Sequence, residues 1–275
     1  MKLEVLSEHP IADAVRARVD AALDAIERSF DVRVVFACES GSRGWGFASP
    51  DSDYDVRFLY VHRLRWYLTV EAQRDVIELP IDDELDIGGW ELRKSLQLLR
   101  KSNPTLLEWL DSPVVYRADS EVAVRLRELG AHFFNPLKGR YHYLAMAKRN
   151  YREHLRSERV RHKKYLYVLR PLLAVRWIDA GRGMAPMRFA DLVAGTVCDA
   201  EVIAEINDLL AIKMRAGEKE YGARRPLLND LIESELARAG RAIDYKKSEG
   251  NATQLDDFLF NTVMSRSENL SLIHI

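Results

Sequence analysis

Two aspartates separated by one residue are the first candidates for chemistry. Asp53 and Asp55 stand at the start of SDYDVRFLYV, a segment whose β-branched and aromatic residues are typical of a strand. Because side chains alternate across a strand, both carboxylates are expected on one face, together with Arg57. Like charges this close repel each other unless a cation compensates them. Mg²⁺ combines carboxylate ligands with substrate phosphates, so we expect a magnesium site here.

Asp86 is the candidate for a third carboxylate. It lies between Leu85 and Ile87 in ELDIGG, a strand-like segment that ends in glycines. A lone acidic residue between apolar neighbours can simply face solvent on a half-buried strand. The presence of Asp53 and Asp55 favours the catalytic interpretation, since carboxylates on neighbouring strands can hold two metal ions roughly 3.5–4 Å apart.

A glycine-rich loop precedes the aspartates. Gly41 permits close backbone approach, so successive N–H groups can bind an anion. Ser42 can donate to a phosphate oxygen, and Arg43 can contact one bidentately. A Gly-Ser pair alone is a common turn, and no Gly-Lys-Ser/Thr follows, so this is not a Walker A loop. Trp45 and Phe47 either stack on a base or anchor the loop to the core, and we favour anchoring.

The segment RHKKYLYVLRPLLAVRWI carries a further set of candidates. Lys163, Tyr167 and Arg170 recur at i, i+4 and i+7, which places them on one helical face. In the functional interpretation, lysine contacts the triphosphate and tyrosine lies near the base; in the alternative, this is a polar stripe that faces water. Lys164 competes with Lys163 for the triphosphate, and the sequence leaves both open. Pro171 either starts this helix or kinks it.

The front portion of the chain predicts mixed secondary structure. Apolar residues recur at helical spacing over residues 10–30. Strand-like VRVVFACE precedes the glycine-rich loop, and YDVRFLYV follows it. Residues 75–79 and 84–89 flank a short turn and predict a hairpin. The stretch WELRKSLQLLRKS predicts a helix, and Asn103-Pro104 supplies a cap and first-turn proline for another.

The rear portion carries helical patterns almost exclusively. Asn135-Pro136 again supplies a cap and a first-turn proline, here for a long helix. The predicted fold is therefore α+β, a mixed β-sheet flanked by helices and followed by an all-helical C-terminal domain. We predict a catalytic domain over residues 1–130 and a helical domain for substrate or nucleotide binding over residues 131–275.

Composition narrows the class of protein. The 275 residues are 47% hydrophobic and 30% charged, as in ordinary soluble globular proteins. No run of about eighteen apolar residues predicts a membrane span. Cys38 and Cys198 are the two cysteines, which favours a cytoplasmic protein without a disulfide framework. The net charge of −1 does not indicate a nucleic-acid binder, but residues 138–170 are rich in basic side chains. These form either a solvated helical surface or a wall that faces a polyanion.

The segment ACESGSRGWGFASPDSDYDVRFLY resembles the signature of the DNA polymerase beta nucleotidyltransferase superfamily: a hydrophobic strand, Gly-Ser, then Asp-x-Asp. Within it, the chain resembles the RlaP or YcgL-like family of predicted nucleotidyltransferases, which is associated in some genomes with RNA ligase. LDIGGWELRKSLQLLRKSNPTLLEWLDSPVVY and KKYLYVLRPLLAVRWI extend the resemblance over most of residues 32–190. It implies a mixed sheet with helices, carboxylates from Asp53, Asp55 and Asp86, and an NTP with magnesium.

The predicted reaction moves a nucleoside monophosphate from an NTP such as ATP to an acceptor hydroxyl, and pyrophosphate leaves. Asp53 and Asp55 are expected to hold a metal on the nucleotide phosphates, and Asp86 to complete a second site and act as general base. The acceptor is either an RNA end in repair or a small molecule or protein. A catalytically silent nucleotide-binding module is the rival, and retention of all three carboxylates argues against it. A metal-dependent phosphoesterase normally needs histidine ligands, and none accompanies this cluster.

Overall fold

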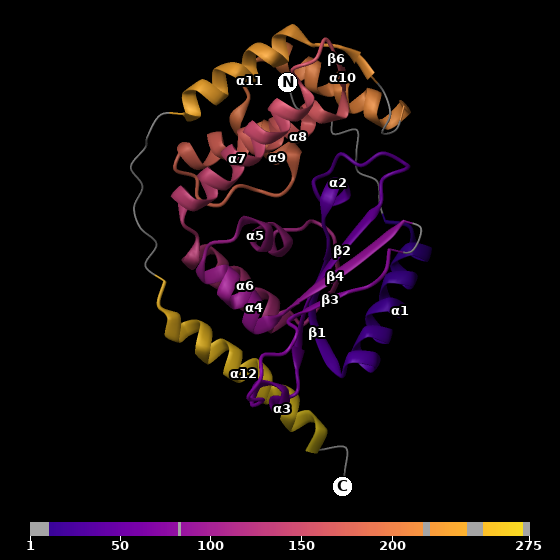
Figure 1. Ribbon diagram of the computed structural model, residues 1–275, viewed down its shortest axis with the longest axis vertical. Coiled ribbons are helices and arrows are strands. Elements are labelled where there is room, and N and C mark those ends of the chain that lie inside the picture. Colours follow the sequence, from indigo (N-terminus) through magenta and orange to yellow (C-terminus); the bar gives the residue numbers. More distant parts are fainter. Residues whose placement is uncertain (1–10, 82–83, 217–220, 241–249, 272–275) are drawn as a thin grey trace. The chain divides into compact units, whose positions relative to one another are not determined.

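A five-stranded mixed sheet with helices on both faces forms the front of the chain (Figure 1). The computed structural model describes residues 11–81, 84–216, 221–240 and 250–271. The strand order is β3-β4-β2-β1-β5, in which β2 and β4 run parallel and the other pairs antiparallel. The predicted mixed sheet flanked by helices is therefore confirmed. The strands are β1 (Val32–Glu39), β2 (Tyr54–His62), β3 (Val76–Glu78), β4 (Leu85–Glu91) and β5 (Val115–Ala118).

The side chains of β2 alternate between the two faces of the sheet and contribute to the hydrophobic core on each face. Val56, Phe58 and Tyr60 point to one face and pack with the buried side chains of α1 (Asp13–Phe30). Leu59 and Val61 point to the other face, which a second group of helices covers. Asp55 and Arg57 share that second face at the start of the strand, where both remain partly exposed. The covering helices are α4 (Leu92–Arg100), α5 (Pro104–Leu110), α6 (Ser120–Phe133) and α12 (Ala252–Ser271).

The predicted helix WELRKSLQLLRKS begins later than expected. Strand β4 continues through Trp90 and Glu91, and the Glu91 carboxylate caps α4 by accepting from the Arg93 and Lys94 N–H groups at 2.6 and 3.3 Å. Trp90 is therefore a strand residue, and its ring lies 3.9 Å from that of Trp109. Strand pairing with β2 and β3 overrides the local helical pattern at these positions.

The remaining elements form a helical unit built around one buried helix. α8 (Lys163–Asp179) is apolar on nearly all sides, and Pro171 lies inside it rather than at its start. Asn135 caps α7 as predicted, since its side chain accepts from the Lys138 N–H at 3.0 Å. Around α8 lie α7 (Pro136–His154), α9 (Phe189–Thr196), α10 (Ala200–Ala216) and α11 (Pro226–Ala239).

The rear of the chain also contains a short ribbon that the helical prediction missed. β6 (Arg159–Arg161) and β7 (Tyr221–Ala223) pair antiparallel. Strands of this length are too short to show a period of two in the sequence, and their partner lies some sixty positions away. Within the described residues, no helix is long and apolar enough to cross a membrane.

Two compact units result, and they do not follow a single cut in the chain. The sheet unit comprises the described residues of 10–40, 53–133 and 248–275, and the helical unit takes 41–52 and 134–247. The predicted division into residues 1–130 and 131–275 lies close to the change of unit after Phe133. It differs in two segments: α12 packs into the sheet core through Leu255 and Phe258, and the glycine-rich loop packs with the helical unit.

Candidate active site

The parallel pairing of β2 and β4 brings two of the three predicted carboxylates together. Asp55 and Asp86 are directly opposite each other in this register, so their side chains share one face of the sheet. Their side chains are 30% and 38% exposed. Asp53 lies just before the strand and is exposed.

An arginine lies between the paired carboxylates. Nη2 of Arg57 donates to Asp55 Oδ1 at 3.0 Å and to Asp86 Oδ2 at 2.6 Å. Nη1 donates to the backbone carbonyls of Asp86 at 2.8 Å and Val56 at 3.1 Å. The sequence places Arg57 on the face of Asp55 by alternation, but the contact with Asp86 depends on the strand order, which no local pattern reveals.

The carboxylates influence one another electrostatically. Burial raises the pKa of Asp55, Arg57 opposes that rise, and the negative charges of Asp86 and Asp53 add to it. All three predicted carboxylates therefore act within one local field. Arg57 is the cation that opposes this rise at Asp55, and its one positive charge faces the two carboxylates of Asp55 and Asp86.

The donor set fits a divalent cation held jointly by protein and substrate. Mg²⁺ is commonly bound by one or two carboxylates together with substrate phosphates, and Asp55 and Asp86 supply such a pair. The two carboxylates converge on one nitrogen of the Arg57 guanidinium. Among the described residues, no group of three His, Cys, Asp or Glu side chains is arranged to hold an ion by itself. The three-carboxylate, two-ion centre expected from Asp53, Asp55 and Asp86 stays a prediction.

A buried glutamate missed by the sequence analysis positions Asp55. Glu39, at the end of β1, is fully buried, and its Oε1 accepts the backbone N–H of Asp55 at 2.8 Å. Its Oε2 accepts the hydroxyl of Tyr116 at 2.5 Å. The Ser40 N–H donates to the Asp55 carbonyl at 2.8 Å. The end of β1 thus holds both the N–H and the C=O of Asp55, and the useful sequence signal was a glutamate at the end of a largely apolar strand.

In the helical unit, the glycine-rich loop starts with a single helical turn, α2 (Gly41–Gly44). Gly41 has a φ of 55°, in the left-handed region that favours glycine. Ser42 is buried, and its carbonyl accepts the Phe47 N–H at 3.0 Å. Nη2 of Arg43 donates to the Ser52 carbonyl at 2.7 Å, which ties the two ends of the loop together. The predicted phosphate contacts of Gly41, Ser42 and Arg43 stay predictions.

Aromatic packing anchors this loop, as we favoured from the sequence. Phe47 is 1% exposed, and its ring lies 6.0 Å from that of Tyr167 and 5.6 Å from that of Phe189. Trp45 packs edge-on against Tyr167 at 5.6 Å. Tyr167 therefore supports the loop from α8.

Two buried cations complete the anchor. Arg170 is 3% exposed, donates to the Met187 carbonyl at 3.2 and 3.3 Å, and lies 4.6 Å from the Trp45 ring centroid. Lys213, which the sequence analysis did not select, is also buried and donates to the Phe47 carbonyl at 2.6 Å. Both cations thus bind the loop and its surroundings. Arg170 does not lie on an exposed polar stripe, so its predicted contact with the nucleotide is left without support from this geometry.

The two candidate lysines begin α8. Lys163 and Lys164 are both half-buried, and Nζ of Lys164 lies 5.1 Å from the Tyr167 ring centroid. The choice between them for the triphosphate stays open, and with it the predicted role of Tyr167 near the base.

The basic segment 138–170 separates into buried and exposed members. Arg140 is buried and donates to Asp179 at 2.8 Å, so it stabilises the helical unit. On the β6–β7 ribbon, the guanidinium of Arg161 lies 5.1 Å from the ring centroid of Tyr221, which is 49% exposed. The exposed basic residues are Lys138, Lys148, Arg149, Arg152, Arg156, Arg159 and Arg161.

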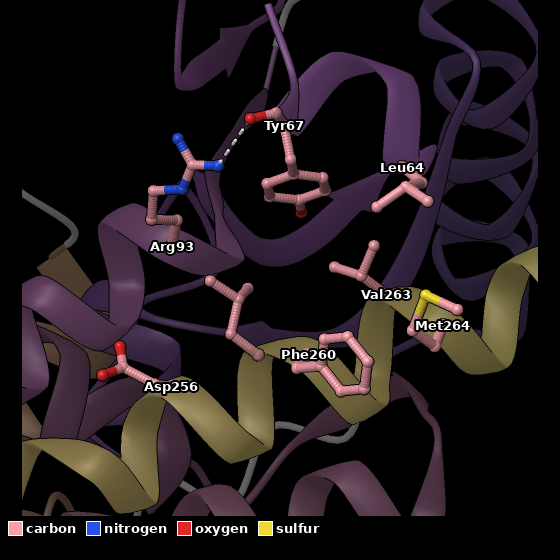
Figure 2. Close-up of a pocket in the computed structure, with 8 residues that line it drawn as sticks. Leu64, Tyr67, Arg93, Asp256, Phe260, Val263 and Met264 are labelled. Atoms are coloured by element: carbon pink, nitrogen blue, oxygen red, sulfur yellow. Dashed lines mark hydrogen bonds between the residues drawn. The ribbon is translucent and has the colours of Figure 1, made fainter.

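A largely apolar pocket of the sheet unit lies away from the carboxylates. It has a volume of about 210 Å³ and lies between α3 (Leu64–Tyr67), α4 and α12, beyond the far end of β2 from Asp55 (Figure 2). Leu64 of α3 and Val263 of α12 both line this pocket. Arg93, also among the lining residues, donates to the Tyr67 carbonyl at 3.5 Å. None of the predicted site residues lines this pocket.

Comparison with known proteins places these features in a family context. The family model RlaP, described as "RNA repair pathway DNA polymerase beta family", matches residues 15–261. The "Uncharacterized protein YcgL" of Bacillus subtilis (strain 168) is 46% identical over 251 residues, which cover 90% of this chain and 96% of that protein. A solved nucleotidyltransferase-like protein from Exiguobacterium sibiricum 255-15 is 12% identical with a TM-score of 0.30, covering 92% of this chain and 78% of that one. That score is too low to carry an argument, so the first two similarities decide the family.

Proposed function

The chain belongs to the RNA repair pathway DNA polymerase beta family, and we propose that it transfers a nucleoside monophosphate from an NTP to an acceptor hydroxyl with release of pyrophosphate. The observation that carries this proposal is that Asp55 and Asp86, at the paired starts of β2 and β4, both contact the Arg57 guanidinium. Two adjacent carboxylates are suited to the Mg²⁺ that accompanies a nucleoside triphosphate.

Asp55 and Asp86 would hold Mg²⁺, with Asp53 as the adjoining third carboxylate. When bound, the ion neutralises phosphate charge and lowers the pKa of the attacking hydroxyl. Asp86 accepts the hydroxyl proton as general base, and Glu39 keeps Asp55 in place by accepting its backbone N–H. The acceptor oxygen then bonds to the α-phosphorus as the bond to pyrophosphate breaks.

The nucleotide contacts are proposed from the sequence order that the family shares. Gly41, Ser42 and Arg43 bind the leaving pyrophosphate through backbone N–H, hydroxyl and guanidinium donors. Lys163 or Lys164 binds the triphosphate.

For the acceptor, we propose an RNA end. The support is the family description together with the exposed basic residues on α7 and β6. Arg161 stacked against the exposed ring of Tyr221 supplies a cation and an aromatic surface side by side, a combination that suits single-stranded RNA.

The test is magnesium-dependent pyrophosphate release from each of the four ribonucleotides, with and without a mixed RNA pool. Asp55→Asn and Asp86→Asn should abolish release, whereas Glu78→Gln, which removes an exposed carboxylate from the adjacent β3 strand, should not. Transfer of α-phosphate label to RNA identifies the acceptor. Release without transfer to RNA points to a small-molecule or protein acceptor. Absence of both release and metal-dependent nucleotide binding contradicts the proposed function.

A further inference from the structure

The two terminal nitrogens of the Arg57 guanidinium bind different kinds of acceptor. Nη1 is bound to strand backbone through the carbonyls of Val56 and Asp86, at 3.1 and 2.8 Å. Nη2 is bound to side chains through the carboxylates of Asp55 and Asp86, at 3.0 and 2.6 Å. One end of the guanidinium therefore holds the strands together, and the other compensates the charge of the carboxylate pair.

The sheet leaves room for this arrangement. Gly88 is directly opposite Arg57 in the β2–β4 register, so a side chain there would share the face with the guanidinium. A Cβ at position 88 would lie 3.8 Å from Arg57 Nη1, and the glycine does not have a positive φ. A Cβ would therefore be in ordinary van der Waals contact here, so the glycine keeps a longer side chain away from the guanidinium and is not required by backbone conformation. Arg57 can fold back along β2 toward Asp55.

A cation held by both carboxylates needs the oxygens that Nη2 already engages. A guanidinium nitrogen and a divalent ion cannot both occupy the position between Asp55 Oδ1 and Asp86 Oδ2, because each would be in direct contact with the other and both are positive. If Arg57 leaves without a replacement, two partly buried carboxylates face each other uncompensated.

We propose that Arg57 is the resident counter-cation of the Asp55–Asp86 pair and competes directly with the divalent metal for it. The arginine keeps the carboxylates assembled when no metal is bound, and Nη2 gives up both contacts when the metal enters. Metal alone therefore binds weakly, and the phosphates of an incoming nucleotide supply the additional ligands that displace the arginine. This inference rests on the proposed function in one respect, namely that the carboxylate pair binds a metal.

The decisive measurement is Mn²⁺ affinity without nucleotide, from the electron paramagnetic resonance signal of unbound Mn²⁺. Arg57→Met keeps the length of the side chain and removes its charge, so Mn²⁺ should bind roughly tenfold more tightly than to the wild-type protein. Asp86→Asn added to Arg57→Met should remove that gain. Arg125→Met, at an exposed arginine on α6 paired with Glu128, is the matched control and should change nothing.

Unchanged or weaker Mn²⁺ binding by folded Arg57→Met protein would overturn the inference, because a purely structural arginine would lower the affinity when removed. If this variant does not fold, the wild-type protein still provides the test. The Nη2 protons of Arg57, assigned through their loss in Arg57→Lys, should exchange faster with water on titration with Mg²⁺, while the Nη1 protons keep their contacts with the Val56 and Asp86 carbonyls. Nη2 protons that remain protected from exchange at metal saturation overturn displacement.

These experiments distinguish failure of the proposed Arg57 role from failure of the proposed nucleotidyl transfer. Pyrophosphate release that depends on Asp55 and Asp86, combined with no gain of Mn²⁺ affinity in Arg57→Met, removes the inference alone. No Mn²⁺ binding to any of these proteins, with or without nucleotide, removes both.

Discussion

Two regions of this protein place arginines in opposite settings. At the carboxylate pair, Arg57 is 20% exposed and is bound by two charged side chains. In the loop anchor, Arg170 is 3% exposed and is bound by a backbone carbonyl and an aromatic ring. A cation between partly exposed carboxylates can exchange with another cation, whereas removal of a buried arginine leaves the carbonyl that it binds without this donor. The first setting is suited to ligand exchange and the second to holding a loop.

The largest effect should come from the carboxylate pair itself. Asp86→Asn should lower the rate of pyrophosphate release about a thousandfold or more, since it removes a metal ligand and the proposed general base. Thermal unfolding should change little, because the side chain is 38% exposed and Asn retains an acceptor for Arg57. A variant that unfolds readily yet keeps its rate would reverse the assignment of this region.

In the loop anchor, we expect substitutions to lower the free energy of unfolding. Phe47→Ala should lower the free energy of unfolding by about 3–5 kcal/mol, as is typical of a fully buried phenylalanine. Urea unfolding measures this change, and Phe260→Ala, at a side chain that is 62% exposed, is the control with a change within about 0.5 kcal/mol. Equal changes in the two variants would show that the loop is not anchored through this ring.

Glu39 sharpens the comparison because it is a fully buried glutamate beside the carboxylate pair. Glu39→Leu should lower the free energy of unfolding by about 3 kcal/mol, since the Asp55 N–H and the Tyr116 hydroxyl lose their acceptor. Glu39→Gln keeps an acceptor oxygen and should lose less. Urea unfolding and pyrophosphate release together test this; a Leu variant as stable and active as the Gln variant would contradict the positioning role.

Arg170→Met provides the direct counterpart to Arg57→Met. We expect a loss of about 2 kcal/mol in the free energy of unfolding, because the Met187 carbonyl loses its charged donor and Trp45 its cation. Mn²⁺ affinity should remain that of the wild-type protein. A shift in metal affinity from this substitution would mean that the two arginines do not differ as proposed.

The smallest effect should appear at the basic ribbon. Arg159→Gln combined with Arg161→Gln should weaken RNA binding and reduce the slope of log affinity against log salt by about 1.4, for two lost phosphate contacts on a single strand. Fluorescence anisotropy across a salt series measures this slope. Arg125→Gln, an exposed arginine on α6 paired with Glu128, is the control. An unchanged slope would remove this ribbon from the acceptor site.

Much of the fold was predictable because its signals are local. The amphipathic pattern of α1, the caps at Asn103 and Asn135, and the strands around the glycine-rich loop each depend on residues within a few positions of one another. The helix expected from Trp90 and the missed β6–β7 ribbon show the limit of such signals. There, pairing with distant strands decided the secondary structure.

By itself, the sequence determined the candidate carboxylates and the family, since the Asp-x-Asp spacing and the Gly-Ser loop are continuous motifs. Only the tertiary structure decided that Asp55 is opposite Asp86, that Arg57 bridges them, and that Arg170 is buried. The physical reason is that strand register and burial arise from packing between segments far apart in the chain, and each segment carries only its own half of those contacts.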